Sequence, residues 1–379
     1  MKRATKLCDW NTRSTGPRGS PTPPHARRWA EAAVIRPYVP LLTPVIPLND
    51  DEPDPRAVTK AAGILRRGGL VAFATETVYG LGADATNPEA VARIFQAKGR
   101  PSFNPLIVHT DRVEMARDCV LQWPASADVL AHCFWPGPLT LVLPRAANIP
   151  DVVTAGRDTV GVRIPKSRVA RALIEATGRP IAAPSANRST GISPTEAWHV
   201  SNDLDGKIDL ILDSGKTGVG IESTVLDLTT SPPRVLRPGS ITVEQIREAL
   251  GCEVLGQADF PPDPHAHSSP GQMDVHYAPR TPTFRIEPNA FEALPREGRW
   301  VLIALGETPI DEGPPGRRPD RQIRLLTPTE AEASLYSHLQ AIDLSGVDFL
   351  VIVPPPDEPR WLAIRDRIWR ASRPWPASV

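Results

Sequence analysis

The 379-residue chain is predicted to fold as an α/β (α+β) protein with two domains. Short apolar runs of strand character alternate with segments of helical spacing, which indicates a sheet with flanking helices. At roughly 100–200 residues per domain, the length favours two domains. Apolar residues make up 41% of the chain, enough for a sizeable core, and charged residues make up 23%.

The first domain is predicted over residues 45–255. Its first helix, Asp54–Arg67, ends at Gly68-Gly69, and its second runs from Asn87 to about Ala97. Asn87 is a capping residue that is followed by a proline at the first helical position, which is a typical helix start. Helices are also expected at Ser167–Thr177 and Thr242–Leu250. Strands are expected at Leu70–Ala74, Leu106–His109, Leu139–Leu143, Val160–Ile164, Ile181–Ala183, Ile208–Asp213, Ser223–Leu228 and Val235–Arg237.

A linker and a smaller domain are predicted to follow. Residues 256–282 are rich in proline and show little periodicity, which indicates a semi-rigid linker. In residues 283–379, the runs Trp300–Leu305 and Phe349–Val353 are typical of buried strands. Arg360–Arg370 has helical spacing of its apolar residues. This part is therefore expected to form a second α/β unit.

The N-terminal residues 1–44 are expected to lie outside the fold as a disordered, basic and proline-rich tail. Residues 1–36 contain many Lys and Arg and only Asp9 and Glu31 as acids. They lack the apolar segment of a secretory signal. An organellar transit peptide remains an alternative, but a disordered extension, or a start codon placed too early, is preferred.

Charge and cysteine content exclude several classes of function. Lys+Arg and Asp+Glu both total 43, so the basic excess of a typical nucleic-acid binder is absent. The cysteines, Cys8, Cys119, Cys133 and Cys252, form no CxxC pair, which argues against a disulfide framework or a zinc site. No apolar run reaches the roughly 18 residues of a membrane span. A cytoplasmic protein is expected.

Two motifs that resemble known sites are incomplete. Gly215-Lys216-Thr217 follows a predicted strand, but a phosphate-binding P-loop requires a glycine where Leu210 stands. His265 and His267 have no cysteine or HExxH partner, so no metal site is predicted from them.

Polar and basic residues recur at the ends of predicted strands. Thr75–Gly82 combines hydroxyl groups with closely spaced glycines, which let a backbone approach a ligand. Taken alone it is equally consistent with a plain turn. Lys98, Arg100 and Asn104 lie in a proline-broken loop, and such cations suit phosphate. Arg163 stands inside an apolar strand and must be paired or face a site.

Three further segments extend this pattern. Ser185 and Asn187 follow one strand, Glu222-Ser223-Thr224 opens another, and Arg237 closes the next. Each is weak evidence when taken alone, and a side-chain turn is the simpler interpretation of the first. Together they predict one concave site built from loops of a sheet. No arrangement of a covalent nucleophile with its base is visible.

These segments, in this order, resemble the signature of the Sua5/YrdC family. Residues 269–279, which include Tyr277, are similar to the linker of its two-domain Sua5 branch. The resemblance covers roughly residues 45–379 and is looser in the C-terminal domain. Ala74 replaces a usual proline and Gln272 a usual methionine, and neither change removes a polar group. The resemblance implies a YrdC-like twisted mixed sheet with flanking helices, and a smaller Rossmann-like C-terminal domain.

The resemblance also implies an activity. L-threonine, bicarbonate and ATP would give L-threonylcarbamoyladenylate and pyrophosphate, with Mg²⁺ carried on the triphosphate. A partner transferase complex would then modify adenosine 37 of certain tRNAs, and direct tRNA binding by this chain is left open. Two alternative functions are possible on the same fold, a carbamoyl transferase and an RNA-binding module. A carbamoyl transferase would carry additional modules that are not visible here, and an RNA-binding module is disfavoured by the zero net charge.

Residue roles follow from the same resemblance. Lys98 and Arg100 are expected at the phosphates as the catalytic cations, without an assigned general base. The residues expected to hold threonine are Thr77, His109, Arg163, Ala183 and Ser223. The residues expected to hold ATP are Arg100, Asn104, Thr159, Ser185, Ser193 and Arg237, with Tyr277 closing over the nucleotide. From the residues alone, His109 is more simply a core histidine and Tyr277 a packing residue of the linker.

Overall fold

The computed structural model describes residues 41–256, 277–288, 290, 294, 297–307 and 318–375. The chain divides into a short unit that ends at Leu42 and a compact unit, Thr43–Val379, that contains every described helix and strand. Most of the predicted N-terminal tail and linker, with His265 and His267, lies outside the described residues. Thr43 is buried and its backbone N–H donates to Asp205 Oδ1 (2.8 Å).

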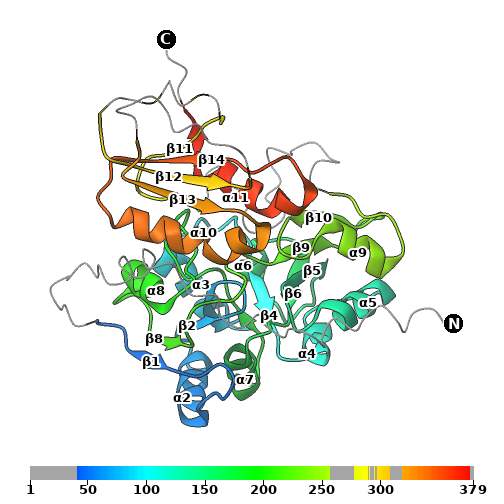
Figure 1. Cartoon of the computed structure of the whole chain (residues 1–379). Coiled ribbons are helices and arrows are strands. Elements are labelled where there is room, and N and C mark those ends of the chain that lie inside the picture. Colours follow the sequence, from blue (N-terminus) through cyan, green and yellow to red (C-terminus); the bar gives the residue numbers. More distant parts are fainter. Residues whose placement is uncertain are drawn as a thin grey trace. The chain divides into compact units, whose positions relative to one another are not determined.

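The larger sheet has ten strands and is mixed. Its order is β1-β8-β2-β3-β7-β4-β6-β5-β9-β10 (Figure 1). The strands are β1 (Val45–Pro47), β2 (Val71–Ala74), β3 (Tyr79–Asp84), β4 (Ile107–His109), β5 (Leu139–Pro144), β6 (Thr159–Arg163), β7 (Ile181–Ala182), β8 (Leu210–Asp213), β9 (Thr224–Asp227) and β10 (Arg234–Arg237). The helices that accompany it are α2 (Pro55–Arg66), α3 (Pro88–Lys98), α4 (Val113–Asp118), α5 (Ala125–Phe134), α6 (Asp151–Thr154), α7 (Arg168–Thr177), α8 (Ala197–Leu204) and α9 (Val243–Leu250).

The smaller sheet has five strands in the order β13-β12-β14-β11-β15, and each of its neighbouring pairs is parallel. The strands are β11 (Thr283–Arg285), β12 (Trp300–Leu305), β13 (Arg321–Leu325), β14 (Phe349–Val353) and β15 (Arg373–Pro374). The helices are α10 (Pro328–Asp343), the 3₁₀ turn η5 (Pro359–Trp361) and α11 (Leu362–Ala371). A parallel sheet with helices agrees with the predicted second α/β unit.

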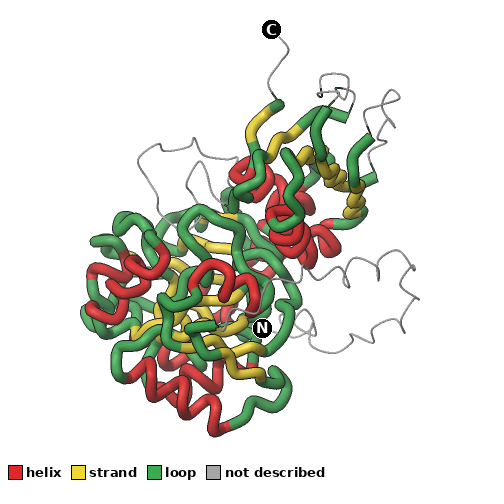
Figure 2. Tube along the Cα trace, turned by 90° about the vertical axis from the view of Figure 1, so that its left-hand side faces the viewer, coloured by secondary structure: helices red, strands yellow, loops and turns green. Residues whose placement is uncertain are grey.

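The larger sheet buries a core on both faces, because side chains alternate along each strand. In β2, Val71 and Phe73 pack into a cluster with α2 and α7. Ala72 and Ala74 point the other way and pack with residues of α3, α5, α8 and α9. Figure 2 shows helices, in red, lying around strands, in yellow. The predicted α/β architecture with flanking helices is confirmed.

Strand β3 was not predicted. The sequence pattern places the whole of Thr75–Gly82 in a ligand-binding loop or a plain turn, but the turn ends before Tyr79 and the rest is a buried strand. A Cβ at Gly82 would lie 2.7 Å from Phe73 and 2.8 Å from Ile181. Gly82 is therefore required for close packing between strands, which local sequence does not reveal.

Five helices are also absent from the sequence prediction: α4, α5, α6, α8 and α10. The start of α10 carries a visible signal, because Thr327 precedes Pro328 and its side chain accepts from the backbone N–H of Glu330 (3.2 Å). None of the helices in the described ranges is both long enough and apolar enough to span a bilayer.

Candidate active site

A cleft of ≈ 540 Å³, open to solvent, collects polar residues from several strands. Nine of the predicted site residues line it: Thr77, Arg100, His109, Arg163, Ala183, Ser185, Ser223, Arg237 and Tyr277. The other lining residues are Thr75, Val78, Gly80, Ile107, Pro184 and Glu222. The strand-end groups that are distant in sequence therefore meet in one cavity.

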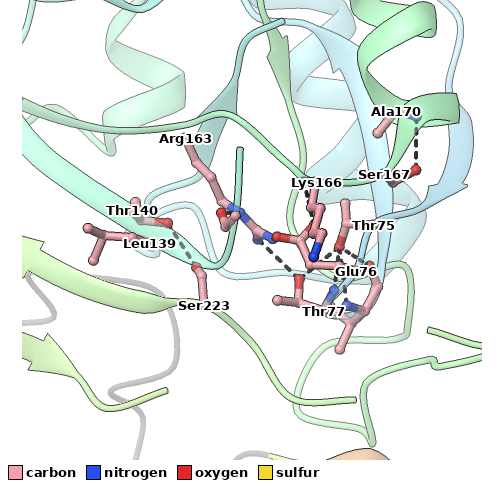
Figure 3. A network of polar contacts seen from close by, with 12 residues as sticks. Thr75, Glu76, Thr77, Leu139, Thr140, Arg163, Lys166, Ser167, Ala170 and Ser223 are labelled. Carbon is pink, nitrogen blue, oxygen red and sulfur yellow. Dashed lines mark hydrogen bonds and ion pairs between the residues drawn. The ribbon is translucent and has the colours of Figure 1, made fainter. Parts of the chain in front are cut away.

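Arg163 lies at the end of β6, and its guanidinium donates hydrogen bonds to three residues of the protein (Figure 3). Its Nη2 donates to Glu76 Oε1 (2.7 Å), its Nη1 to Thr77 Oγ1 (3.1 Å) and its Nε to the Gly137 carbonyl (3.1 Å). The second oxygen of Glu76 accepts from the backbone N–H of Lys166 (2.9 Å). The charge of Arg163 is thus paired within the protein and fixed in direction.

The turn after β2 is closed by its own hydroxyl groups (Figure 3). Thr75 Oγ1 donates to the Val78 carbonyl (2.7 Å) and lies 2.7 Å from Thr77 Oγ1. Because the Thr75 proton is used, Thr77 donates to Thr75 and accepts from Arg163. This chain of bonds sets the position of Thr77 in the cleft.

Ser223 and Arg237 form a second fixed group. Ser223 Oγ lies 2.8 Å from Thr140 Oγ1 on β5 and accepts from Arg237 Nη2 (3.2 Å). The Ser223 carbonyl also accepts from Nε and Nη2 of Arg237 (3.1 and 2.9 Å). Burial lowers the pKa of Arg237, which remains a cation at neutral pH.

Arg100 brings a further cation to the cleft. It donates to the carbonyls of Asn104 (3.3 Å) and Pro105 (2.9 Å). Burial lowers the pKa of Arg100 to about 10, and the positive charge of Arg237 acts in the same direction. Two buried side chains of like charge that line one cleft favour an anionic ligand. Asn104 is buried and supports Arg100 from outside the lining.

Lys98 does not line the cleft. Its ammonium donates to the carbonyl oxygens of Ser185 (2.6 Å) and Asn187, and to Asn187 Oδ1 (3.3 Å). An ammonium has three donors, so these contacts use them all. Burial, followed by the charge of Arg100, lowers the pKa of Lys98 well below its usual range. In this structure, Lys98 acts on the loop that presents Ser185.

His109 lies at the end of β4, paired across the sheet with Arg163. Burial lowers its pKa to about 3, with the charge of Arg163 as the next cause. The imidazole is therefore neutral at neutral pH. Its buried Nδ1 has no hydrogen-bond partner among the residues that the structure describes.

Glu222 is the carboxylate in the cleft lining, and its oxygens are already engaged. Oε1 accepts from Ser193 Oγ, while Oε2 accepts from Tyr336 (3.1 Å) and from Arg367 Nε (3.1 Å). Burial acts to raise the pKa of Glu222, but Arg367 and Arg237 outweigh it and the pKa is lowered. Ser193 is fully buried and reaches the cleft only through this carboxylate.

Tyr277 places an aromatic ring at the cleft. Its ring stacks on that of Tyr336 at 5.7 Å and is almost completely buried. Its backbone adopts a positive φ of 59°, which is unusual for any residue other than glycine. Burial raises the pKa of Tyr277 to about 12, so the phenol is neutral.

Thr159 lies apart from the other predicted residues. It opens β6, four residues before Arg163, which is about 13 Å at roughly 3.3 Å per residue. It pairs with Pro144 and is not in the cleft lining. The strand geometry therefore separates Thr159 from this cleft.

The described part of the chain offers no cluster of three or more His, Cys, Asp or Glu side chains that would hold a metal ion. Glu222 gives its oxygens to Ser193, Tyr336 and Arg367. Mg²⁺ usually binds through one or two carboxylates, water and substrate phosphates. This donor set fits a Mg²⁺ ion that enters on a phosphate ligand as part of the substrate.

Sequence reasoning assigned no role to Glu76, Thr140, Glu222, Tyr336 or Arg367. Glu76 and Glu222 stand inside the polar motifs and were visible there. Arg367 also had a signal, because it interrupts the apolar stripe of its helix three residues after Ile364. Thr140 and Tyr336 look like ordinary strand and helix residues, and only the tertiary contacts identify them.

Comparison with family models shows two matches that together cover most of the chain. Residues 63–239 match the Sua5/YciO/YrdC model, which is described as telomere recombination. Residues 241–373 match a model described as the C-terminal domain of threonylcarbamoyl-AMP synthase.

Curated proteins and a solved structure of the same family are similar to this chain over most of their length. The threonylcarbamoyl-AMP synthase of Pyrococcus abyssi is 41% identical, across 82% of this chain and 93% of its own. The protein of that name from Bacillus subtilis is 42% identical, across 84% and 93%. The crystal structure of P. abyssi Sua5 complexed with L-threonine superposes with a TM-score of 0.77 at 38% identity, covering 87% of this chain and 99% of that one.

Proposed function

The chain belongs to the threonylcarbamoyl-AMP synthase family in its two-domain Sua5 form. From this premise, we propose that it converts L-threonine, bicarbonate and ATP into L-threonylcarbamoyladenylate and pyrophosphate. One observation carries the proposal: three buried guanidinium groups, those of Arg100, Arg163 and Arg237, line one cleft together with hydroxyl groups. Such a cleft suits small reactants that are anionic.

We assign threonine to the side of the cleft formed by Arg163, Thr77 and His109, with Ala183 and Ser223. The relative whose crystal structure contains L-threonine supports this substrate. Arg163 presents a guanidinium to the threonine carboxylate, and Thr77 and the Nδ1 of His109 offer hydrogen bonds to its polar groups.

We assign ATP to the side formed by Arg100, Ser185, Arg237 and Tyr277. The two guanidinium groups face the phosphates, and the Tyr277 ring offers an apolar surface. Asn104 and Ser193 support this side through Arg100 and Glu222, and Thr159 is left out. Lys98 acts by fixing the Ser185 loop, rather than by direct contact with phosphate.

The chemistry needs two anionic partners to approach each other. The neutral threonine amine attacks bicarbonate to give a carbamate and water. A carbamate oxygen then attacks the α-phosphorus of ATP as pyrophosphate leaves. The cations lower the repulsion and stabilise the charge that develops on the leaving group. His109 stays neutral and is not assigned as a base. Positioning and charge stabilisation provide the catalysis, and the MgATP complex brings the metal ion with it.

The product is a reactive mixed anhydride that another enzyme must use. We propose that a cytoplasmic transferase complex moves the threonylcarbamoyl group to adenosine 37 of tRNA. The proposal requires no direct contact between this chain and tRNA.

The test is mass spectrometry of the nucleotide products. Incubation with MgATP, L-threonine and bicarbonate is expected to yield threonylcarbamoyl-AMP, and leaving out any one of the three should abolish it. Isotope-labelled threonine should shift the mass of the product. Absence of the adduct with fresh protein would refute the proposed reaction, and product formation from carbamoyl phosphate would favour a carbamoyl transferase instead.

A further inference from the structure

Arg367 of α11 is the feature from which a further role follows. Its side chain is completely buried, on the same stripe of the helix as Ile364 and Ile368. A buried guanidinium is costly unless its donors are paired. Nε donates to Glu222 Oε2 (3.1 Å), and Nη1 donates to the Pro238 carbonyl (2.8 Å) and to Asp366 Oδ2 (2.9 Å).

These contacts end on the walls of the cleft. Glu222 lines the cleft, and Pro238 directly follows the lining residue Arg237. The Arg367 guanidinium also lies over the ring of Tyr277, 5.3 Å from its centroid. One side chain from α11 therefore touches or adjoins three parts of the lining that come from separate segments.

Helix α10 contacts the same wall. Tyr336 donates to Glu222 Oε2 (3.1 Å) and stacks on Tyr277. The backbone of Gly220, two residues before Glu222, is so close to α10 that a Cβ there would lie 2.3 Å from the Glu332 carbonyl. The wall of the cleft is therefore packed directly against the helices of the smaller sheet.

We propose that Arg367 is a positioning residue for the nucleotide side of the cleft. It holds Glu222, the Arg237-Pro238 turn and the Tyr277 ring in one arrangement, so that the C-terminal unit sets the geometry of ATP binding. The identity of the ligand rests on the proposed function above. On the threonine side, Arg163 and Thr77 are fixed by contacts of their own, whereas Ser223 is bound to Arg237.

The experiment compares ligand affinities in the full-length chain. Arg367→Lys keeps the charge and its link to Glu222, but an ammonium lacks the planar fork that also reaches the Pro238 carbonyl. The Kd for MgATP is expected to rise about tenfold, the size typical of a lost charge-assisted hydrogen bond. The Kd for L-threonine should stay within about twofold, because Arg163 and its partners are unchanged. Isothermal titration calorimetry measures both.

Two companion variants make the comparison selective. Arg360→Ala removes an exposed guanidinium just before α11 and should change neither affinity. Among the described residues, Arg360 forms an ion pair with Glu358. Tyr336→Phe keeps the ring and removes only the hydroxyl on Glu222, so a smaller rise in the Kd for MgATP, about threefold, is expected. Tyr336→Phe decides the question if Arg367→Lys does not fold.

An equal loss of both affinities with a lower unfolding temperature would show a general structural role and overturn the proposal. An unchanged Kd for MgATP in both variants would also overturn it. If the wild-type chain binds MgATP but forms no threonylcarbamoyl-AMP, the proposed function fails while the affinities still decide the role of Arg367. A wild-type chain that does not bind MgATP overturns both.

Discussion

His109 and His199 are two buried histidines with different surroundings. Burial lowers the pKa of each to about 3, helped by Arg163 near His109 and by Lys216 near His199. His109 belongs to the cleft, whereas the Nδ1 of His199 accepts from the backbone N–H groups of Thr195 and Glu196 at the start of α8. Both side chains are neutral at neutral pH, so His109 adds no charge to the cleft.

Because burial lowers the pKa of these histidines in the folded protein, the free energy of unfolding depends on pH. Below about pH 6.5 an unfolded histidine takes up a proton, while the buried His199 stays neutral down to about 3. The unfolded state then binds more protons, so the free energy of unfolding falls as the pH drops through this range, by at most about 1.4 kcal/mol per pH unit for each such histidine. His199→Gln keeps a capping acceptor but cannot titrate, and should make this loss shallower.

Urea unfolding of the wild type and His199→Gln near pH 7 and near pH 5 measures the effect. The exposed His132→Gln is the matched control and should lose stability as the wild type does. Parallel losses in His199→Gln and the wild type would contradict the assignment of His199 as a buried neutral group.

Strands β9 and β10 show how elements aim the site residues. Their antiparallel register shifts between Val235 and Arg237, which indicates a bulge. A bulge changes the direction of the side chain that follows it, and here it precedes Arg237. Gly239 then passes very close to the start of β9, where a Cβ would lie 2.4 Å from the backbone nitrogen of Thr224. The contacts of Arg237 with Ser223 depend on this close approach.

Gly239→Ala should therefore disturb the cleft. The added methyl would push the loop after β10 away from Ser223. A displacement of about 1 Å in a catalytic site can lower turnover about 100-fold. Gly218→Ala is a matched control, because a Cβ at Gly218 meets nothing within 4 Å. Rates of pyrophosphate release from the two variants test this expectation, and wild-type turnover in Gly239→Ala would show that the close approach is not needed.

At the scale of the whole molecule, buried residues from loops of the larger sheet pack against the smaller sheet and its helices. The net charge of the chain is zero. One apolar cluster joins Val78, Ile192, Ile221 and Tyr277 to residues of β12, α10 and α11. The cations of the cleft are concentrated within a chain of zero net charge, so we expect any attraction for anions to be confined to the cleft. A ligand bound in the cleft contacts walls that both sheets support, and should stabilise the whole unit.

MgATP is expected to raise the unfolding temperature of the chain. At a ligand concentration of about 100 times Kd, binding to the folded state alone adds about 2.7 kcal/mol. Adenosine at the same concentration should have little effect, because it lacks the phosphates that the guanidinium groups would hold. Thermal unfolding followed by circular dichroism, with MgATP, with adenosine and without ligand, measures the effect. Equal stabilisation by adenosine would contradict phosphate binding by these cations.

Much of the fold could be predicted because its signals are local. Asn87-Pro88 marks the start of α3, and the apolar runs at Leu139–Leu143 and Phe349–Val353 are strands β5 and β14. Strand β3 could not be predicted, since its glycines serve packing between β2 and β7. Helix α10 has a capping residue, Thr327, that can be recognised in the sequence, so the start of this helix could have been predicted.

The sequence by itself determined the α/β class, the family resemblance and the polar residues that line the cleft, because each depends on residue type and order along the chain. Only the tertiary structure decided where these residues lie and which groups they contact. Lys98 is bound to carbonyl oxygens, Thr159 is a strand length away, and Arg367 reaches the cleft from α11. Such contacts join residues far apart in the chain, and the local pattern around each residue carries no information about its distant partner.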